Sequence, residues 1–314
     1  MKIVGTGSAV PELIVKNQEL ESFLDTTDEW IRTRTGICQR HIHQGNLEEL
    51  AAQAALRALE NAGLKPQQLD LILCSNVYSR YMTPALSCVV QGMIGADCPC
   101  LDVNGACAGF LYALELAHAQ LATGRYQTIL VLSAEEPTRM MDWTDRSTCV
   151  LFGDAAAGVV VIPDGREAAF SMHTQSNTEF IHAYNDPGNC PYEKTGRKHQ
   201  AVYMNGQEVY KFAVHRATED ITRLCVQQGV SLSEIDYFLL HQANYRILDA
   251  VRLRLKQPKE KFPHNIEMYG NTSSASLPLL MDQLNRGGKL HPGNILAMSA
   301  FGAGLTAGAC LLTW

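Results

Sequence analysis

The pattern of apolar and polar positions occurs twice along this chain. Residues 58–74 read ALENAGLKPQQLDLILC, and residues 224–240 read LCVQQGVSLSEIDYFLL. Each segment predicts the end of a helix, a glycine that stops it, an aspartate seven residues later and then an apolar strand. The glycines are Gly63 and Gly229, so the second copy follows the first at a distance of 166 residues.

Further segments repeat in the same order. In each half a turn of small residues leads into a helical pattern, which is followed by glycine and a buried strand. The first-half segments are 101–107, 110–121 and 129–133, and their counterparts are 268–274, 277–284 and 295–299. A last strand at 157–161 matches 307–311 at a spacing of only 150 residues, which places an extra stretch near 137–152 in the first half.

Strands and helices that alternate, and that do so twice, predict an α/β protein made of two similar halves packed together. We place the halves at residues 1–165 and 166–314, related by an approximate two-fold axis. Any α/β chain can contain one such pair of similar segments. Three pairs in the same order and at a nearly constant spacing favour a real internal repeat. A site in such a fold forms where the halves meet, at loops and helix starts.

Composition narrows the class of protein. The chain has 314 residues, of which 46% are hydrophobic, enough for a large core, and its net charge of −6 argues against nucleic-acid binding. No apolar run is long enough for a membrane helix, and the N-terminus lacks the apolar stretch of a signal peptide, so we expect no membrane association and a cytoplasmic location. The ten cysteines are scattered without paired zinc-site spacing, so we expect reduced thiols and no metal.

One cysteine differs from the others in its setting. Cys107 lies in the sequence NGACAGF, between an apolar strand and the start of a helix. Backbone N–H groups at a helix start lower the pKa of a thiol, and the small neighbours leave room for a substrate carbonyl. A strand-to-helix turn is also a recurrent way to present a nucleophile. The other cysteines are better explained as small buried apolar side chains.

Two polar residues of the second half are candidates to join Cys107. His241 directly follows the apolar strand at 237–240, and a polar side chain at the carboxyl end of a buried strand often points into a site. Asn271 lies in the turn GNTS, which the repeat makes equivalent to the turn of Cys107. Asn271 could instead cap its helix and His241 could hydrogen-bond a loop. The repeat nevertheless brings all three residues toward the axis between the halves.

At this point five motifs resemble beta-ketoacyl-acyl-carrier-protein synthase III, a family of condensing enzymes with the thiolase fold. They are DTTDEWIRTRTGI at 25–37, ACAGF at 106–110, HQAN at 241–244, GNTS at 270–273 and FGAG at 301–304. The resemblance covers essentially the whole chain and implies an α-β-α-β-α layered fold. It also implies a Cys-His-Asn triad of Cys107, His241 and Asn271.

The resemblance implies a two-step reaction that needs no metal or redox cofactor. Cys107 attacks an acyl-CoA, and the backbone N–H groups of Cys107 and Ala303 stabilise the oxyanion. Malonyl-ACP then loses carbon dioxide while His241 and Asn271 hydrogen-bond its thioester carbonyl, and the carbanion yields a 3-oxoacyl-ACP. The implied contacts with CoA are Trp30, Arg34, Arg146 and Asn244. Trp30 could instead be a core aromatic, and the two arginines could be solvated surface charges.

Partners and acyl specificity follow from the same resemblance. Residues 245–261 hold six basic and two acidic residues, a complementary surface for an acidic carrier protein, although a solvated helix face is nearly as good an explanation. The candidate docking residues are Arg246, Lys211, Arg252 and Lys256. A homodimer is implied, with the buried strand at 98–103 as the pairing edge. Thr83, where a Phe would restrict the acyl chain, predicts a deeper pocket, unless Thr83 merely packs at the subunit interface.

Two other functions are compatible with the same fold. A relative in specialised metabolism could transfer the acyl group to another acceptor, and a non-catalytic partner subunit could share the fold. The presence of all three triad residues argues against the inactive subunit. Thiolase and hydroxymethylglutaryl-CoA synthase use different residues around the same cysteine. The family often has three glycines where this chain has Gly302-Ala303-Gly304, and often Trp where it has Ala307, so the acyl starter stays open.

Overall fold

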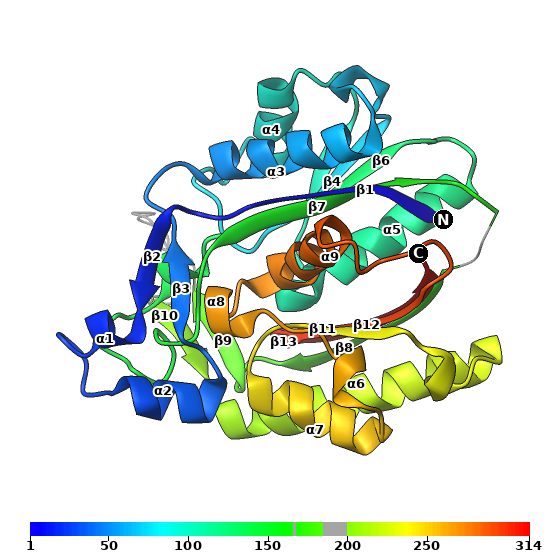
Figure 1. Ribbon diagram of the computed structural model, residues 1–314. Helices are drawn as coiled ribbons and strands as arrows, with labels where there is room; N and C mark the ends of the chain where they lie inside the picture. The colour runs from blue at the N-terminus through cyan, green and yellow to red at the C-terminus, as the bar shows by residue number, and fades with distance from the viewer. Residues whose placement is uncertain (166–167, 185–199) are drawn as a thin grey trace.

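The described part of the chain, residues 1–165, 168–184 and 200–314 of a computed structural model, forms five layers. Figure 1 shows them from top to bottom as helices, a sheet, a central pair of helices, a second sheet and a last helical layer. This α-β-α-β-α order is the one implied by the resemblance, and the predicted fold class is confirmed.

The upper sheet is formed by strands of the first half in the order β1-β7-β6-β4-β5. The bounds are β1 Lys2–Ala9, β4 Leu71–Ser75, β5 Cys100–Val103, β6 Ile129–Glu135 and β7 Ala155–Ile162. Strand β4 runs parallel to β5 and β6, so their carboxyl ends lie at one edge of the sheet. Helices α3 (Leu47–Ala62) and α4 (Leu86–Ile94) cover its outer face, which explains why β4 and β6 are continuous buried runs.

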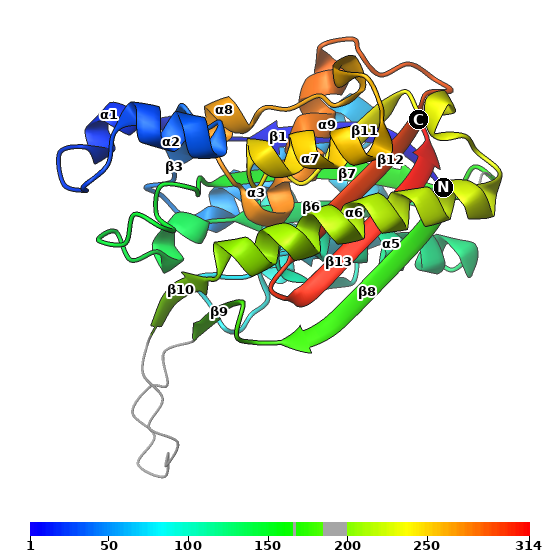
Figure 2. The same ribbon diagram turned by 90° about the horizontal axis from the view of Figure 1, so that it is seen from below.

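The lower sheet is formed by strands of the second half in the order β11-β12-β13-β8. The bounds are β8 Ala169–Asn177, β11 Tyr237–Leu240, β12 Ile295–Gly302 and β13 Gly304–Thr313. Strand β11 runs parallel to β12, and β13 is antiparallel to both β12 and β8. Figure 2 shows α6 (Gly206–Gln228) and α7 (Tyr245–Leu255) across the outer face of this sheet.

The central layer consists of α5 (Gly109–Ala122) and α9 (Ser276–Arg286), which lie between the two sheets. Their apolar side chains join those of both sheets in one core, in which Phe110, Leu114 and Leu280 are almost completely buried. Full burial of each such side chain is worth about 1.5–3 kcal/mol, so this shared core holds the two halves in a fixed relation. The helix starts that carry the candidate residues are therefore held against each other.

The two sheets share one order of four strands. The order β1-β7-β6-β4 of the first sheet matches β8-β13-β12-β11 of the second, and the first sheet adds β5. The segment between β6 and β7 runs from 136 to 154, whereas a single residue separates β12 from β13. This is the extra stretch that the reduced spacing predicts. The last strand of the first sheet ends at Ile162 and the first strand of the second sheet begins at Ala169, and the division into residues 1–165 and 166–314 stays a prediction.

Shorter elements complete the described chain, most of them toward one end of the layers, at the left of Figure 1. The strands and helices are β2 Leu13–Lys16, β3 Gln39–Ile42, β9 Ile181–Tyr184, β10 Gln200–Met204, α1 Asn17–Leu20, α2 Asp28–Thr35 and α8 Ile266–Tyr269. The 3₁₀ turns are η1 Pro66–Gln68, η2 Ala106–Ala108, η3 Pro137–Met140, η4 Leu232–Glu234, η5 Lys259–Lys261 and η6 Ser273–Ala275.

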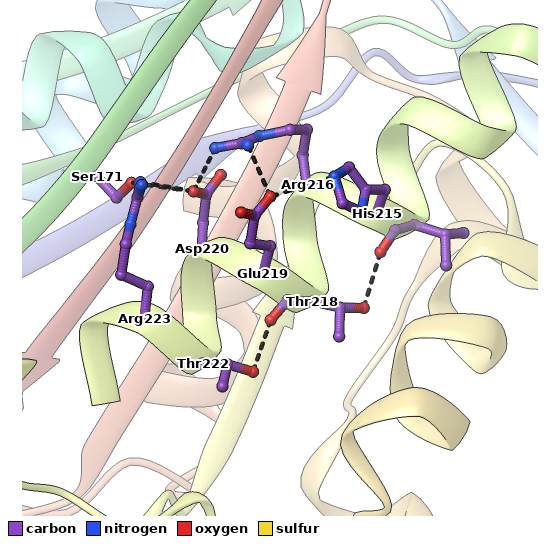
Figure 3. Close-up of polar contacts among 9 residues, drawn as sticks. Ser171, His215, Arg216, Thr218, Glu219, Asp220, Thr222 and Arg223 are labelled. Atoms are coloured by element: carbon purple, nitrogen blue, oxygen red, sulfur yellow. Dashed lines mark hydrogen bonds and ion pairs between the residues drawn. The ribbon is translucent and has the colours of Figure 1, made fainter. Parts of the chain in front are cut away.

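A buried carboxylate ties the long helix α6 to strand β8. Figure 3 shows Asp220 between two arginines of its own helix and a serine of the strand. Asp220, only 1% exposed, accepts hydrogen bonds from Arg216 at 2.5 Å, Arg223 at 2.8 Å and the Ser171 hydroxyl at 3.1 Å. Charge-assisted bonds of this kind are among the stronger ones in proteins, and here they set the position of the helix whose first turns line the site.

The strand expected at residues 98–103 differs from the prediction. It is shorter, spanning Cys100–Val103, and it is not buried, because it lies at the edge of its sheet and pairs only with β4. Leu101 is 44% exposed in the single chain. Among the described residues, no helix combines the length and the apolar character that a bilayer crossing requires.

Candidate active site

Cys107 lies on the sharp turn that connects β5 with α5. Ala106, the first residue of the 3₁₀ turn η2, has a left-handed backbone with φ of 49°. Small neighbours are required, because a Cβ at Gly109 would approach Oγ of Ser75 to 2.1 Å, and one at Gly105 would lie 3.0 Å from the Cα of Gly109. The glycines that marked this segment in the sequence thus permit the close packing that presents the thiol.

The turn before α9 mirrors this geometry. Ser273, the first residue of the 3₁₀ turn η6, has φ of 52°, nearly the value at Ala106. When the two turns are matched at these left-handed residues, Asn104 corresponds to Asn271 and Cys107 corresponds to Ser274. Asn271 therefore lies three residues ahead of the position equivalent to the cysteine.

His241 follows β11 and is 2% exposed. Its Nδ1 lies 2.7 Å from Oγ of Ser276, at the start of α9, and this oxygen also accepts a hydrogen bond from the N–H of Gln242 at 3.4 Å. Burial lowers the pKa of His241 to about 3, so the ring is neutral at physiological pH. With the Ser276 hydroxyl donating to Nδ1, the ring proton is on Nε2, which makes Nε2 a hydrogen-bond donor.

The side-chain amide of Asn271 is oriented by its own turn. Its oxygen accepts a hydrogen bond from the backbone N–H of Ser273 at 2.9 Å. The alternative interpretation, in which Asn271 serves only as a local cap, describes this oxygen but leaves the amide nitrogen available as a donor. Asn271 and His241 can therefore both present N–H groups to a substrate oxygen.

Three cavities that share lining residues lead from the surface past Cys107. The mouth, of about 470 Å³, is lined by Trp30, Arg34 and Arg146 among others, and the neck, of about 110 Å³, by Cys107, His241 and Asn271. The inner cavity, of about 470 Å³, also contains Cys107 in its wall. Its apolar lining consists mainly of Val77, Met140, Met141, Phe152, Ile181 and Val202. The structure thus brings the three predicted catalytic residues to one narrow passage.

Ala303 lies in the short connection between β12 and β13 and contributes to the wall of the inner cavity. The preceding Gly302 packs directly on the nucleophile turn, since a Cβ there would approach the backbone nitrogen of Cys107 to 2.6 Å. A glycine at 302 is therefore what lets this connection reach the N–H of Cys107. The close approach supports an oxyanion site formed by the N–H groups of Cys107 and Ala303.

The sequence predicts a lowered pKa for Cys107, and this prediction is wrong for the resting structure. Burial raises the pKa of the thiol to about 12, and this outweighs the lowering by its backbone N–H and by the Ser273 hydroxyl. The short η2 turn at the helix start does not offset the loss of hydration. Activation of the thiol therefore depends on what happens to its proton.

The four candidate CoA contacts gather at the mouth. The guanidinium carbon of Arg34 lies 4.6 Å from the centre of the Trp30 ring and that of Arg146 lies 5.2 Å from it. Arg146 also bonds Asp25. Asn244 caps α7 by accepting a hydrogen bond from the N–H of Arg246, and it lines both the mouth and the neck. A half-buried aromatic ring between two cations suits a flat ligand that carries phosphates.

The candidate docking residues do not form one cluster around the passage. Arg246 lines the mouth and donates a hydrogen bond to the backbone oxygen of Thr33 at 3.1 Å. Lys211 pairs with Glu208 on the exposed side of α6, and Arg252 pairs with Asp249. Lys256 ends α7, roughly 15 Å along the helix from Arg246.

Thr83 lies in an exposed loop and does not line any of the three cavities of the single chain. Its neighbour Met82 is 99% exposed. Among the described residues, no group of three or more His, Cys, Asp or Glu side chains could hold a metal ion.

Sequence reasoning missed three polar side chains next to the passage. They are Glu135 at the end of β6, Ser273 beside Cys107, and Ser276 beside His241. A signal for Glu135 was present, since an acidic residue ends the mostly apolar strand at 129–135, and His241 directly follows its own apolar strand. The serines belong to the run NTSSAS, in which sequence alone does not separate a ligand from a helix start.

Comparison with known proteins agrees with this geometry. Family models of 3-oxoacyl-[acyl-carrier-protein] synthase III match residues 101–178, and its C-terminal region matches 225–314. The beta-ketoacyl-[acyl-carrier-protein] synthase III of Clostridium acetobutylicum is 40% identical, with 100% of this chain and 98% of the relative covered.

Solved structures agree over the whole chain. The 3-oxoacyl-[acyl-carrier-protein] synthase III of Aquifex aeolicus VF5 is 38% identical with a TM-score of 0.92, covering 100% of this chain and 99% of its own. The priming beta-ketosynthase of the R1128 polyketide biosynthetic pathway is 33% identical with a TM-score of 0.94, covering 99% and 95%. This chain therefore belongs to the beta-ketoacyl-[acyl-carrier-protein] synthase III family of thiolase-fold condensing enzymes and is an acyltransferase of that type.

Proposed function

We propose that this protein initiates fatty-acid synthesis by joining an acyl group from acyl-CoA to malonyl-ACP. The observation that carries the proposal is that Cys107, His241 and Asn271 line one neck between a cationic mouth and an apolar inner cavity. In the first step Cys107 attacks the thioester, and CoA leaves. The backbone N–H groups of Cys107 and Ala303 stabilise the tetrahedral oxyanion.

The second step uses the donors of the second half. Malonyl-ACP enters after CoA has left, and Nε2 of His241 and the amide nitrogen of Asn271 hydrogen-bond its thioester carbonyl. As carbon dioxide departs, negative charge develops on that oxygen, and the two donors stabilise it where it forms. The carbanion attacks the acyl group on Cys107 and yields 3-oxoacyl-ACP. A neutral histidine suits this role, because it donates a hydrogen bond without becoming an ion pair with the substrate.

The cavities support an assignment of the substrate parts. The mouth would hold the nucleotide end of CoA, with Trp30 stacking the adenine and Arg34 and Arg146 near the phosphates. Asn244 would contact the pantetheine arm where the mouth meets the neck, and the acyl chain would occupy the apolar inner cavity. In this proposal CoA is a substrate, and the reaction needs no other cofactor.

The proposed partners are an acidic carrier protein and a second copy of the chain. The carrier would approach Arg246 at the mouth. Lys211, Arg252 and Lys256 would add positive charge to the surface farther from the mouth. Strand β5 is an unpaired edge with exposed Leu101, and such edges pair readily with another strand. We propose a homodimer joined at β5. We also propose that it is cytoplasmic and binds neither nucleic acid nor membranes. A stable, active monomer in light scattering would contradict this assembly.

Intact-mass analysis with a panel of acyl-CoAs, followed by malonyl-ACP, tests both half-reactions. The wild-type protein should gain one acyl mass and lose it when malonyl-ACP is added. Cys107→Ala should gain none, whereas the matched variant Cys88→Ala, which removes an exposed thiol on α4, should gain the mass normally. Uptake of an acyl group by a folded Cys107→Ala variant would refute the nucleophile assignment.

A second candidate function is supported by the likeness to the priming ketosynthase of a polyketide pathway. An enzyme of that kind would use the same site and a different carrier protein. The panel experiment distinguishes the two functions when malonyl-ACP of fatty-acid synthesis is compared with malonyl-loaded carriers from specialised pathways. A kcat/KM higher for one of the latter would favour the second function.

A further inference from the structure

Glu135 is a carboxylate at the active site that the two-step mechanism leaves without a role. It is the last residue of β6 and is 1% exposed. It accepts hydrogen bonds from the backbone N–H of Val77 at 3.2 Å, from the Ser273 hydroxyl at 3.1 Å and from the Ser274 hydroxyl. All three donors are neutral, and burying a carboxylate among neutral groups is costly unless the charge or its protonation serves a purpose.

Ser273 connects this carboxylate with the nucleophile. Its Oγ lies 3.1 Å from Oε1 of Glu135 and 3.5 Å from Sγ of Cys107. A hydroxyl can donate one hydrogen bond and accept others at the same time. The Ser273 O–H lies within reach of both Sγ of Cys107 and the carboxylate, but it can donate to only one of them. When it donates to ionised Glu135, its Oγ can accept the S–H of the Cys107 thiol. The three groups then form one continuous path for a proton.

His241, the histidine that lines the neck, is not placed to take this proton. Its Nδ1 lies 2.7 Å from the Ser276 hydroxyl, and when that hydroxyl donates to Nδ1, the proton on Nε2 is the one that the condensation step needs. Burial also lowers the pKa of His241 to about 3 and raises the pKa of Cys107 to about 12. The thiol therefore needs a proton acceptor inside the protein other than His241.

We propose, on the basis of the function above, that Glu135 accepts the Cys107 proton through Ser273 as the thiol attacks acyl-CoA. The S–H proton moves to Ser273 Oγ, and the Ser273 hydroxyl proton moves to Oε1 of Glu135. The sulfur forms a bond to the acyl carbon, and the bond between that carbon and the CoA sulfur breaks. Glu135 then returns its proton by the same path to the leaving CoA thiolate, so the products are acyl-Cys107, CoA thiol and ionised Glu135.

The titration of Glu135 is suited to this exchange. Burial, the largest influence, raises its pKa to about 7, and hydrogen bonds from Ser274, Val77 and Ser273 lower it. The titratable groups that interact with it among the described residues are the thiols of Cys107 and Cys74. A carboxyl with a pKa near 7 can both accept and return a proton near neutral pH. Since its folded pKa is raised, the acceptor is present above about pH 7 and lost as pH falls below it.

The test is the pH dependence of the single-turnover rate of Cys107 acylation by acetyl-CoA and octanoyl-CoA, measured by rapid quench and intact mass. In the wild-type protein the rate should rise up to about pH 7 and then stay level. Glu135→Gln should lower the rate at pH 7 by about 10²-fold, and its rate should climb about tenfold per pH unit from pH 6 to 9, because solvent must now remove the proton.

The sign of the change separates this role from a purely electrostatic one. The charge of Glu135 raises the pKa of Cys107. If Glu135 acted only through this charge, Glu135→Gln would increase the fraction of thiolate and speed acylation. Matched serine variants give a second test in case Glu135→Gln folds poorly. Ser273→Ala interrupts the proton path between Cys107 and Glu135, so its rate should not become level above about pH 7. Ser274→Ala removes a hydroxyl that donates to the carboxylate and accepts a hydrogen bond from Ser75 at 2.9 Å but is not on the path to Cys107, so it should keep the level region and shift its onset to higher pH.

The outcomes distinguish this inference from the proposed function. If wild-type protein acylates at Cys107 but its rate has no level region, or if folded Glu135→Gln and Ser273→Ala match the wild-type profile, Glu135 is not the acceptor and the function stands. If Cys107→Ala itself takes up acyl groups, the proposed function fails first. Partial recovery of the level region in Glu135→Asp would support the requirement for a carboxylate rather than for its shape.

Discussion

Oγ of Ser276 lies 2.7 Å from Nδ1 of His241, and a Ser276 hydroxyl that donates to Nδ1 leaves the ring proton on Nε2. Ser276 is the first residue of α9, and both side chains are almost fully buried. The T-shaped contact of the ring with Phe301, at 5.3 Å between ring centres, holds its plane. A serine in the helix start of the second half thus prepares the histidine to donate from Nε2 into the neck.

Ser276→Ala should therefore impair condensation more than acylation. Without the hydroxyl, the proton can move to Nδ1, and Nε2 becomes an acceptor that repels an enolate oxygen. We expect malonyl-ACP decarboxylation to fall about 10²-fold, the usual cost of losing one such donor. Acylation of Cys107 in the same variant is the internal control, and equal losses in both steps would contradict the orientation argument.

His241→Ala and Asn271→Ala should each reduce decarboxylation about 10²–10³-fold more than acylation, because each removes one donor to the developing enolate. Asn271→Asp is the sharper variant. It retains the oxygen that accepts the Ser273 N–H at 2.9 Å, and it replaces the donating nitrogen with a second carboxylate oxygen, whose negative charge also repels an enolate. A substantially active Asn271→Asp protein would show that Asn271 acts as a structural cap.

Charge reversal at Arg246 should raise the apparent KM for malonyl-ACP at low salt, because an acidic carrier then meets a negative charge at the mouth. The structure adds that the KM for acyl-CoA should rise as well, since Arg246 lines the same mouth as Trp30. Arg254→Glu, with the same change on the exposed side of α7, is the matched control. Equal KM values for both variants would argue against docking at the mouth.

Thr83→Phe should restrict the acyl chain if the exposed loop at 81–85 enters the inner cavity of a partner subunit, as the resemblance implies. The native protein should then prefer acyl-CoAs longer than acetyl, and each buried methylene is worth about 0.8 kcal/mol, or about fourfold in kcat/KM. Steady-state kinetics with acetyl-, butyryl-, octanoyl- and lauroyl-CoA provide the measurement. A native preference for acetyl-CoA, or no effect of the substitution on long chains, would contradict the prediction.

Asp220→Ala should destabilise the fold, because it leaves Arg216, whose side chain is only 11% exposed, without its buried partner. We expect the free energy of unfolding to fall by about 3 kcal/mol in urea denaturation. Glu219→Ala is the matched control, since Glu219 also pairs with Arg216 but is 48% exposed, and such surface pairs contribute about 1 kcal/mol or less. Similar losses in both variants would show that the buried contact is not the anchor.

The repeat was readable from sequence because it is a matter of local pattern. Buried strands need continuous apolar runs, helix ends need glycine, and both requirements recur in each half whatever the tertiary contacts. The paired stops at Gly63 and Gly229 have φ of 69° and 65°, as helix-ending glycines do. The position of Cys107 between a strand and a helix start was predictable for the same reason.

Other properties depend on residues that are distant in the chain. The pKa of Cys107 moved opposite to the expectation because burial by both halves outweighs the helix start. Glu135 and Ser273 are 138 residues apart, and Cys107 and Ser273 are 166 apart, so no local pattern relates them. Strand β5 is exposed rather than buried because it occupies the edge of its sheet, and strand order is a tertiary property.

The amino-acid sequence alone thus determined the two α/β halves, the helix-start cysteine and the polar residues that end the central strands, since these depend on periodicity and turn chemistry. Only the folded chain decided that the Asn271 oxygen faces its own turn, that a neutral His241 has Nδ1 beside Ser276, and that Ser273 lies between Glu135 and Cys107. Hydrogen-bond direction and burial arise where two halves meet, and neither half contains that information by itself.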